Sequence, residues 1–339
     1  AYSLGCFMEK YKRAVLANGI LLAAVMTSEA ALEHCSPLKL VTSIPLTPVA
    51  DGRGELAPVK IGGQDYRMTV DTGSSMTAIS GKAADDLKLV RHTGNFEFID
   101  LSGDQSSQYV QSSFQLGTLK SDTAAFVILP NMNMSAEGSA GLLGADVLRR
   151  FDVSIDFGAD KMDLLSQDHC EGKVIYWPAS AVAVVPMRVT HSGGIVFPVL
   201  VDGREVYAQL DTGASNSTIN LDTAESNFGL KMGSDDTKES GDLLGSKGLH
   251  TYLHTFKSID FSGLAVSNPK VYIIPNMMRD TFENRPETGS HIPDASKAEN
   301  KAEMLIGMNI LRHLHIYIAY KEEKLYITPA GTAGASASA

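Results

Sequence analysis

Residues 66–75 read YRMTVDTGSS, and this stretch decides the fold because residues 206–215, 140 positions further on, read VYAQLDTGAS. Each copy is an alternating, strand-like run that ends in Asp-Thr-Gly. A single Asp-Thr-Gly is weak evidence, since three common residues recur by chance and a lone Asp often caps a turn. Two copies, each after an apolar strand, indicate a duplicated feature of the chain.

Further matching stretches support a duplication and keep the same order along the chain. ILPNM at residues 128–132 corresponds to IIPNM at residues 273–277. LLGADVLRR at residues 142–150 corresponds to LIGMNILRH at residues 305–313. The period is far longer than that of a solenoid repeat, so the sequence predicts two homologous domains in one polypeptide.

Short apolar or alternating runs, bounded by Gly, Asn, Asp and Pro, predict a mainly β fold with few short helices. Residues 279–301 are charged, contain Pro and lack periodicity, and we interpret them as a mobile surface insertion. We predict the following organisation: a leader and mature N-terminus over residues 1–40, a first lobe over 41–168, a linker over 169–184, a second lobe over 185–330 and a disordered tail over 331–339.

The composition is that of a soluble globular protein with a substantial core. The 339 residues carry a net charge of -10, and 44% of them are hydrophobic. Nucleic-acid binding needs clustered cations, which this sequence lacks. The sequence also lacks a metal-ligand spacing, a phosphate loop and a dinucleotide fingerprint. We therefore expect no metal, no cofactor and no nucleic-acid partner.

The N-terminal segment is typical of an export signal. A basic start (Lys10, Lys12 and Arg13) precedes a mostly apolar run over residues 14–26, and small residues permit a cut after Ala30. This pattern predicts a secreted or periplasmic protein whose membrane contact is, at most, an N-terminal anchor. An uncleaved anchor is the alternative, although the run is short for a full span, and a buried core helix is a weaker one.

Three cysteines occur, namely Cys6, Cys35 and Cys170. Removal of the leader deletes Cys6 and leaves an even pair. In an oxidising compartment we therefore predict a disulfide between Cys35 and Cys170. The alternative is two unpaired thiols.

The two aspartates of the repeated motif, Asp71 and Asp211, are the candidate catalytic residues. Peptide hydrolysis at mild pH needs a base that activates water and an acid that protonates the substrate. Two carboxyl groups a few ångströms apart cannot comfortably both ionise, so they share a proton and divide these roles. The alternative is that both aspartates only cap turns.

The neighbours of the aspartates have expected supporting roles. The glycines let the backbone bend and bring an amide close to each carboxylate, and the threonines can hydrogen-bond across the interface between the halves. These supporting residues are Thr72, Gly73, Thr212 and Gly213. Ser74 can hydrogen-bond the outer oxygen of Asp71, whereas Ala214 cannot do so for Asp211, and this asymmetry is a hypothesis for which aspartate carries the proton.

The two motifs resemble the catalytic turns of pepsin-like and retropepsin-like aspartic proteases. That family has a second hallmark, two hydrophobic residues followed by Gly, which is matched here by residues 142–144 and 305–307, ending in Gly144 and Gly307. The resemblance covers about residues 44–328. It implies two mostly β, barrel-like lobes about a pseudo-twofold axis, with a substrate cleft between them and a short helix after each Gly.

The resemblance also implies a β-hairpin flap that closes over the substrate. The first candidate spans residues 98–108, with Gly103 and Asp104 near its tip. The second spans residues 242–249, with Gly245 and Ser246 near its tip. Gly at a tip suits a turn that must move. The alternative is a pair of ordinary surface hairpins.

These observations together predict an aspartic endopeptidase that hydrolyses peptide bonds through a water held between Asp71 and Asp211. Its partner is a peptide or protein substrate, and we expect a monomer because one chain supplies both aspartates. The alternative is a non-catalytic peptide-binding module on a protease scaffold. A third hypothesis is a specific processing protease that needs a partner, or a cut within residues 279–301, to become active.

Overall fold

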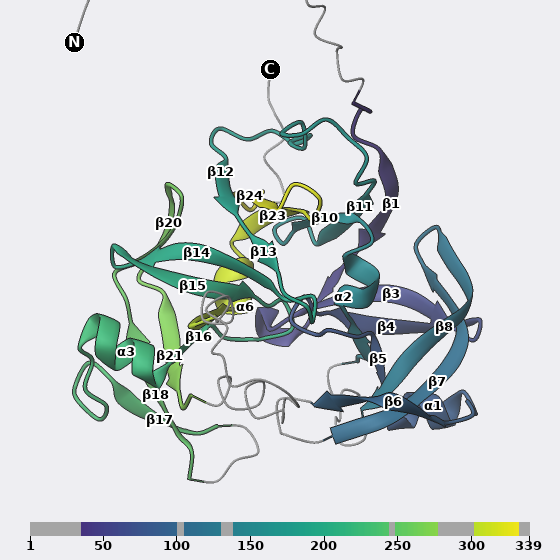
Figure 1. The fold of residues 1–339 in the computed structure, drawn as a ribbon, viewed down its shortest axis with the longest axis horizontal. Helices are drawn as coiled ribbons and strands as arrows, with labels where there is room; N and C mark the ends of the chain where they lie inside the picture. Colours follow the sequence, from purple (N-terminus) through teal and green to yellow (C-terminus); the bar gives the residue numbers. More distant parts are fainter. Residues whose placement is uncertain (1–34, 100–104, 130–137, 244–247, 277–301, 332–339) are drawn as a thin grey trace, which may run out of the picture. The chain divides into compact units, whose positions relative to one another are not determined.

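Strands dominate the computed structural model, which describes residues 35–99, 105–129, 138–243, 248–276 and 302–331 (Figure 1). The prediction of a mainly β fold is confirmed. The predicted export signal, the predicted insertion over residues 279–301 and residues 332–339 of the predicted tail lie outside the described residues.

The first half forms an eight-stranded sheet with the order β2–β3–β4–β9–β5–β8–β7–β6. Its strands are β2 (Thr47–Pro48), β3 (Glu55–Ile61), β4 (Gln64–Val70), β5 (Ala78–Ser80), β6 (His92–Ile99), β7 (Gln105–Leu116), β8 (Leu119–Leu129) and β9 (Gly141–Leu143). Strand β4 begins exposed and ends with Met68, Thr69 and Val70 all buried. Its place between β3 and β9 gives the backbone of β4 a hydrogen-bonding partner on each edge.

The second half forms a sheet with the order β17–β18–β21–β16–β22–β15–β14–β19–β20, with β13 also paired to β14. Its strands are β13 (Arg188–Val189), β14 (Ile195–Val201), β15 (Arg204–Leu210), β16 (Thr218–Asn220), β17 (Lys238–Asp242), β18 (His250–Thr255), β19 (Ser258–Phe261), β20 (Leu264–Ser267), β21 (Lys270–Ile274) and β22 (Met304–Ile306). The series β14–β15–β22–β16–β21 repeats the series β3–β4–β9–β5–β8 of the first half, so the sequence repeat is also a repeat of topology.

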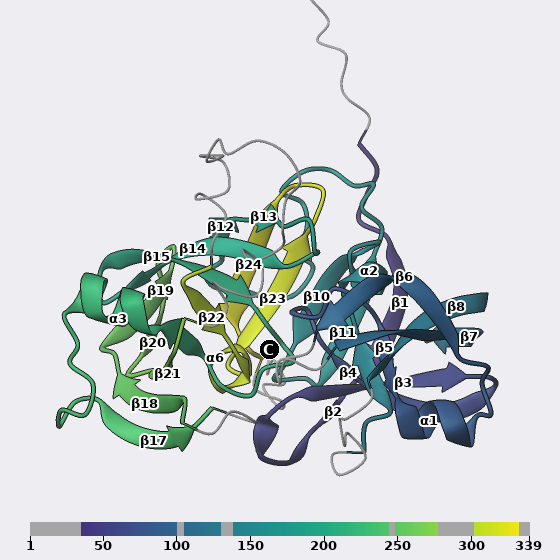
Figure 2. The same cartoon turned by 60° about the horizontal axis from the view of Figure 1, so that its bottom comes forward.

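A third, six-stranded sheet is shared by the two halves, with the order β1–β11–β10–β23–β24–β12. Its strands are β1 (Leu40–Pro45), β10 (Asp152–Asp156), β11 (Lys161–Leu165), β12 (Ala183–Pro186), β23 (Leu314–Ala319) and β24 (Lys324–Pro329). The halves meet where β10 pairs antiparallel with β23. Figures 1 and 2 show purple β1 and yellow β23 and β24 in this one sheet, although they come from opposite ends of the described chain.

The helices are short, and the two predicted after Gly144 and Gly307 are present. Helix α1 (Gly81–Asp86) begins after Ser80, whose hydroxyl oxygen accepts a hydrogen bond from the Ala83 amide at 3.1 Å. The other helical segments are η1 (Ala50–Gly52), α2 (Ala145–Leu148), α3 (Leu221–Phe228) and α6 (Met308–Leu311). Helices α2 and α6 directly follow Gly144 and Gly307. Within the described ranges, no helix has the length and apolar character needed to cross a membrane.

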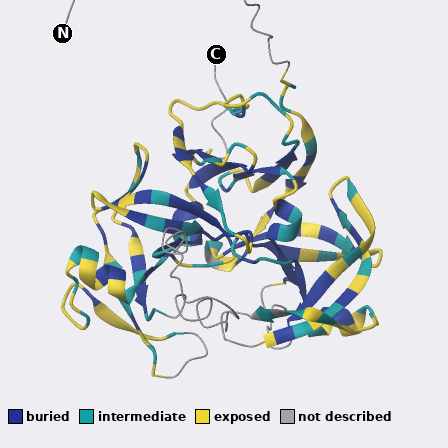
Figure 3. Cartoon of the chain, in the orientation of Figure 1, coloured by how far each residue is buried: buried dark blue, intermediate teal, exposed yellow. Residues whose placement is uncertain are grey.

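One hydrophobic core runs through all three sheets. It contains Ile79 from the first half, Ile219 from the second and Ile155 from the shared sheet, each at most 1% exposed. Figure 3 shows the buried residues along the strands and the exposed ones mainly on turns and outer hairpins. Because the core is continuous, the two Asp-Thr-Gly turns are held on one scaffold.

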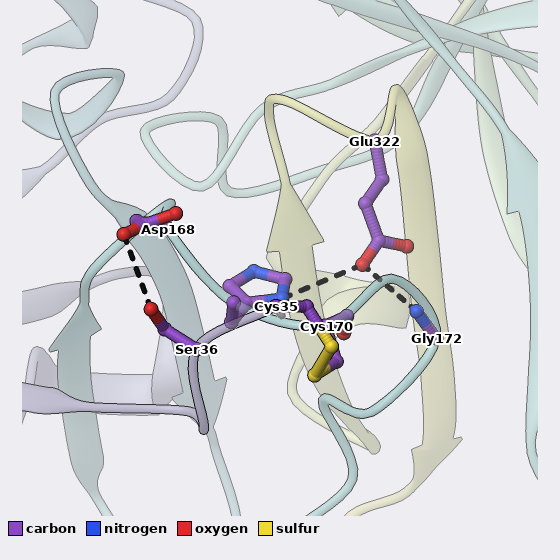
Figure 4. The surroundings of a disulfide bond; sticks show 7 residues. Cys35, Ser36, Asp168, Cys170, Gly172 and Glu322 are labelled. Atoms are coloured by element: carbon purple, nitrogen blue, oxygen red, sulfur yellow. Dashed lines mark hydrogen bonds and ion pairs between the residues drawn. A yellow bond between two sulfur atoms is a disulfide. The ribbon is translucent and has the colours of Figure 1, made fainter. Parts of the chain in front are cut away.

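A disulfide joins Cys35 to Cys170, with 4.8 Å between the two Cα atoms (Figure 4). It ties the residues before β1 to the linker that follows β11. The Cys170 amide also donates a hydrogen bond to the Ser36 carbonyl at 2.9 Å. The disulfide thus fixes the segment that leads into β1 of the shared sheet.

Candidate active site

Each candidate aspartate directly follows the central strand of its half. Strand β4 pairs in parallel with β9, and the Asp71 amide continues this ladder by donating to the Leu143 carbonyl at 3.0 Å. Strand β15 pairs in parallel with β22, and the Asp211 amide donates to the Ile306 carbonyl at 3.1 Å. The two aspartates therefore occupy equivalent positions in the two halves of the duplicated fold.

The structure brings the carboxyl groups of Asp71 and Asp211 together. A Cβ atom added to Gly213 would lie 2.4 Å from Asp71 Cγ, and one added to Gly73 would lie 2.5 Å from Asp211 Cγ. Each glycine thus abuts the carboxyl group of the opposite half. The aspartates are only 9% and 7% exposed, respectively. Glycine is required at both positions because any side chain would overlap a carboxyl group.

Backbone amides hold one oxygen of each carboxyl group. Asp71 Oδ1 accepts from the amides of Gly73 and Ser74, both at 2.9 Å. Asp211 Oδ1 accepts from the amides of Gly213 and Ala214, at 2.9 and 3.1 Å. These bonds follow from the turn that each aspartate begins, and the two carboxyl groups also interact with each other through their side chains.

The two threonines bind reciprocally across the interface between the halves. Each backbone amide donates to the hydroxyl oxygen of the other threonine, from Thr72 to Thr212 and back, at 3.1 Å in both directions. The Thr72 hydroxyl donates to the Leu210 carbonyl at 3.0 Å, and the Thr212 hydroxyl donates to the Val70 carbonyl at 2.7 Å. Both threonines are 1% exposed. The four bonds link the two strands that end in the aspartates.

Thr72→Val is expected to destabilise the protein because it leaves the Leu210 carbonyl and the Thr212 amide buried without their partner. Each unsatisfied group costs about 1–3 kcal/mol. Urea unfolding followed by circular dichroism measures the change, with Thr123→Val at an exposed position of β8 as the control. A variant as stable as the wild type would contradict the assigned role of these bonds.

Gly144 and Gly307 support the aspartate turns from below. A Cβ atom on Gly144 would lie 2.5 Å from the Met76 carbonyl carbon, and one on Gly307 would lie 2.6 Å from the Asn216 carbonyl oxygen. The amides of the residues that follow, Ala145 and Met308, each donate at 2.8 Å to a carbonyl in the aspartate turn of the same half. The backbone can approach this closely only where there is no side chain.

A second symmetric pair of contacts was missed by the sequence reasoning. Asp146 Oδ1 accepts from the amide and the hydroxyl of Thr77, both at 2.7 Å. Asn309 Oδ1 accepts from the amide and the hydroxyl of Ser217, both at 2.8 Å. The sequence repeat could have revealed these contacts, because Asp146 and Asn309 each lie two residues after Gly144 and Gly307.

The prediction for Ser74 is wrong in this geometry. Its hydroxyl donates to the Met76 carbonyl at 2.9 Å, and only its backbone amide contacts Asp71. A serine so close to a turn finds a backbone carbonyl within its own loop. Because its hydroxyl proton is used there, Ser74 gives no reason to assign the shared proton to one aspartate.

Burial is the main influence on the acidity of the aspartates. It raises the pKa of Asp71, as does the charge of Asp211, while the amides of Ser74 and Gly73 lower it. Burial also raises the pKa of Asp211 against the opposing effect of the amides of Gly213 and Ala214. Since both shifts point upward, the pair resists complete ionisation and retains a proton where isolated carboxyl groups would have lost theirs.

The two flap candidates lie only partly within the described residues. In the first half, β6 pairs with β7, with Phe98 opposite Ser106. In the second half, β17 pairs with β18, with Asp242 opposite His250. Both segments are therefore hairpins. The predicted tip residues, Gly103, Asp104, Gly245 and Ser246, lie outside the described residues.

An apolar cavity of about 290 Å³ opens beside the Asp71 turn. It is lined by Met76, Gly94, Phe96, Tyr109, Ala125, Phe126 and Val127. Met76 belongs to the same loop as Asp71, and the aromatic residues come from the first hairpin and the strand after it. A larger cavity of about 750 Å³ is lined by residues such as Lys60, Arg67 and Lys82 and contains neither aspartate. The smaller cavity is not lined by an aspartate either, but it reaches the loop that begins at Asp71 through Met76.

The family model described as "Aspartyl protease" matches residues 57–147 and 197–310. These two segments make up more than half of the chain and contain the two Asp-Thr-Gly motifs. The chain belongs to the aspartyl protease family. In this aspartyl protease, one segment of the match falls in each half and includes the strand that leads into each aspartate.

Solved structures and curated sequences give two further findings. The aspartyl protease chain is similar to the aspartic proteinase from Irpex lacteus, at 12% sequence identity and a TM-score of 0.48. The similarity covers 87% of this chain and 99% of the Irpex lacteus chain. A search of curated proteins found no match.

Proposed function

We propose that this member of the aspartyl protease family is an active endopeptidase that uses Asp71 and Asp211 as its catalytic pair. The observation that carries the proposal is the contact of the two buried carboxyl groups, each against the glycine of the opposite half. A protein that needed these aspartates only as turn caps would not require them to meet. Their upward pKa shifts favour a state with one shared proton, which supplies a base and an acid together.

The mechanism follows from that protonation state. The ionised carboxyl group takes a proton from a water molecule as the water oxygen attacks the scissile carbonyl carbon. The protonated carboxyl group gives its proton to the carbonyl oxygen, which forms a neutral gem-diol intermediate. Transfer of a proton to the amide nitrogen then lets the C–N bond break. No acyl-enzyme forms, because the attacking group is water and not a side chain.

The apolar cavity beside the Asp71 turn is proposed to bind a hydrophobic side chain of the substrate. Its lining is aromatic and aliphatic, and its volume of about 290 Å³ accommodates one large side chain. The corresponding hairpin of the second half has a different character, since His250 contacts Glu239 at 2.9 Å and Asp242 at 3.4 Å. We therefore expect an apolar preference on one side of the scissile bond and weaker selection on the other.

Location, substrate and oligomeric state belong to the same proposal. The Cys35–Cys170 disulfide supports an exported protein, because such bonds persist in oxidising compartments. The substrate is an extended peptide, and the functional unit is a monomer because one chain supplies both aspartates. A non-catalytic peptide-binding module remains the alternative function.

Digestion of a mixed peptide library from acid to neutral pH, with and without pepstatin, tests this proposal. We expect internal cleavage that pepstatin blocks, with one large apolar residue enriched beside the cut. Peptide binding without cleavage at any pH would favour the binding module. Cleavage that appears only after a cut within residues 279–301, or after addition of a partner, would favour the processing protease.

A further inference from the structure

His169 lies at the start of the linker between the halves, and its side chain is almost fully enclosed. The side chain is 1% exposed and faces the six-stranded sheet. Its Nε2 atom lies 2.6 Å from Asp152 Oδ2, and its Nδ1 atom lies 3.1 Å from the Cys170 carbonyl oxygen. Glu322 Oε1 lies 3.6 Å from the same Nδ1 atom. Figure 4 shows Glu322 near the disulfide.

The contacts of His169 fit a ring that carries a proton on both nitrogens. Neutral imidazole has one donor nitrogen and one acceptor nitrogen, whereas imidazolium donates from both. Here the Nε2 atom faces a carboxyl oxygen, and the Nδ1 atom faces a carbonyl oxygen and a second carboxyl oxygen. These partners all accept hydrogen bonds, so the arrangement fits imidazolium.

Asp152 has the complementary arrangement of an ionised carboxylate. It is 0% exposed and receives three donors. Besides His169, the Tyr317 hydroxyl donates to Oδ2 and the Tyr320 amide donates to Oδ1, both at 3.1 Å. Burial raises the pKa of Asp152, even against the hydrogen bonds of His169, Tyr317 and Tyr320, which lower it. We nevertheless assign the charged form, because all three contacts place a donor against a carboxyl oxygen.

Glu322 contributes a second attachment of the linker. Its Oε1 atom accepts from the Gly172 amide at 3.0 Å, and its Oε2 atom accepts from the Tyr326 hydroxyl at 2.5 Å. Lys324 lies 4.0 Å from Glu322 and is also bonded to Glu171. Among the residues that the structure describes, two titratable groups contact His169 directly, namely Asp152 on β10 and Glu322 after β23. The titratable groups that surround these two carboxyl groups are Tyr317 on β23, Tyr320 after β23, Lys324 and Tyr326 on β24, and Glu171 in the linker.

We propose that His169 is a pH-operated latch. As imidazolium it holds the linker to strand β10 of the first half and to the turn between β23 and β24 of the second half, and it releases the linker as the pH rises. Asp152 belongs to the first half and Glu322 to the second, so one charged ring joins three segments. Loss of its proton turns one ring nitrogen into an acceptor that faces an oxygen. Either Asp152 or the Cys170 carbonyl then loses its donor inside the fold.

The direction of the effect follows from the groups around the ring. Burial lowers the pKa of His169, but the hydrogen bond and charge of Asp152, with the charge of Glu322, outweigh it and raise the pKa above its ordinary value of 6.5. The latch therefore contributes its full stability below about pH 6.5 and loses it as the pH rises through the higher value of the folded state. His315 opposes this trend, because burial lowers its pKa to about 4.

Comparison of the wild type with His169→Gln isolates the latch, because His315 is common to both proteins. Glutamine can still donate one hydrogen bond to Asp152 but carries no charge. His191→Gln, at an exposed position, is the matched control. Two quantities are measured across pH: the unfolding equilibrium constant, and hydrogen–deuterium exchange of residues 169–178 after correction for the intrinsic rate.

The latch predicts that the wild type has an unfolding constant about tenfold smaller than His169→Gln at about pH 5, and that this ratio falls toward one above about pH 8. Exchange of the linker should accelerate with pH in the wild type and stay fast in the variant. A ratio that does not change with pH would overturn the proposal. If the variant does not fold, ¹⁵N NMR of wild-type His169 gives the answer instead, since neutral imidazole at about pH 5 would also overturn it.

Discussion

Asp71→Asn and Asp211→Asn are each expected to abolish peptide hydrolysis while leaving the protein folded. Asparagine keeps the shape of the side chain and can still accept from the turn amides, but it cannot exchange a proton with water or substrate. Loss of one positioned acid or base costs about a hundredfold to ten-thousandfold in rate. Because both carboxyl groups take part in every turnover, we expect the two variants to be similarly inactive.

The measurement is the kcat/KM for a cleaved library peptide, together with thermal unfolding of each variant. Asp122→Asn, at an exposed site on β8, is the matched control and should retain full activity. Both active-site variants should be at least as stable as the wild type near neutral pH, because the neutral amide removes a buried carboxyl group whose pKa is raised. Retained cleavage in either variant would exclude a shared catalytic pair.

Gly213→Ala is expected to have the second largest effect, on both activity and stability. The new Cβ atom would lie 2.4 Å from Asp71 Cγ, so the carboxyl group or the whole turn must move. Overpacking of this kind costs about 1–3 kcal/mol of stability. A displacement of about 1 Å in a catalytic group costs on the order of a hundredfold in rate.

The symmetric variant Gly73→Ala meets Asp211 in the same way and should behave alike. Ala214→Ser is the control, because the corresponding position of the first half already carries Ser74 and the added atom stays within the loop. Urea unfolding and kcat/KM are measured for all three variants. If Gly213→Ala were as active as Ala214→Ser, the two carboxyl groups could not be in the contact described here.

The sequence repeat predicted the elements that build the site, because each repeated segment has a pattern that can be recognised from neighbouring residues. An alternating strand leads into Asp-Thr-Gly, and an apolar pair leads into Gly144 or Gly307. The close approach at these glycines explains why no other residue stands there. The exchange of hydrogen bonds between Thr72 and Thr212 was also anticipated, since residues at equal stations meet at a pseudo-twofold axis.

The shared six-stranded sheet was not anticipated, because the sequence of a strand does not show which distant strand of the other half it pairs with. Strand β10 is a short run whose partner β23 lies more than 150 residues away, as the contact of Ser154 with His315 shows. The hydroxyl of Ser74 was placed incorrectly for a related reason. Choice among several nearby acceptors depends on the path of the loop, and the sequence does not specify that path.

The ¹³C NMR titration of the Asp71 and Asp211 carboxyl carbons, assigned with the two asparagine variants, tests the central claim most directly. The account predicts two separate titration steps, the upper one well above the ordinary aspartate pKa of about 3.9, with one proton shared between them. Activity should be confined to that interval. Loss of both protons together near the ordinary value would show that the two carboxyl groups do not interact, and would contradict the account.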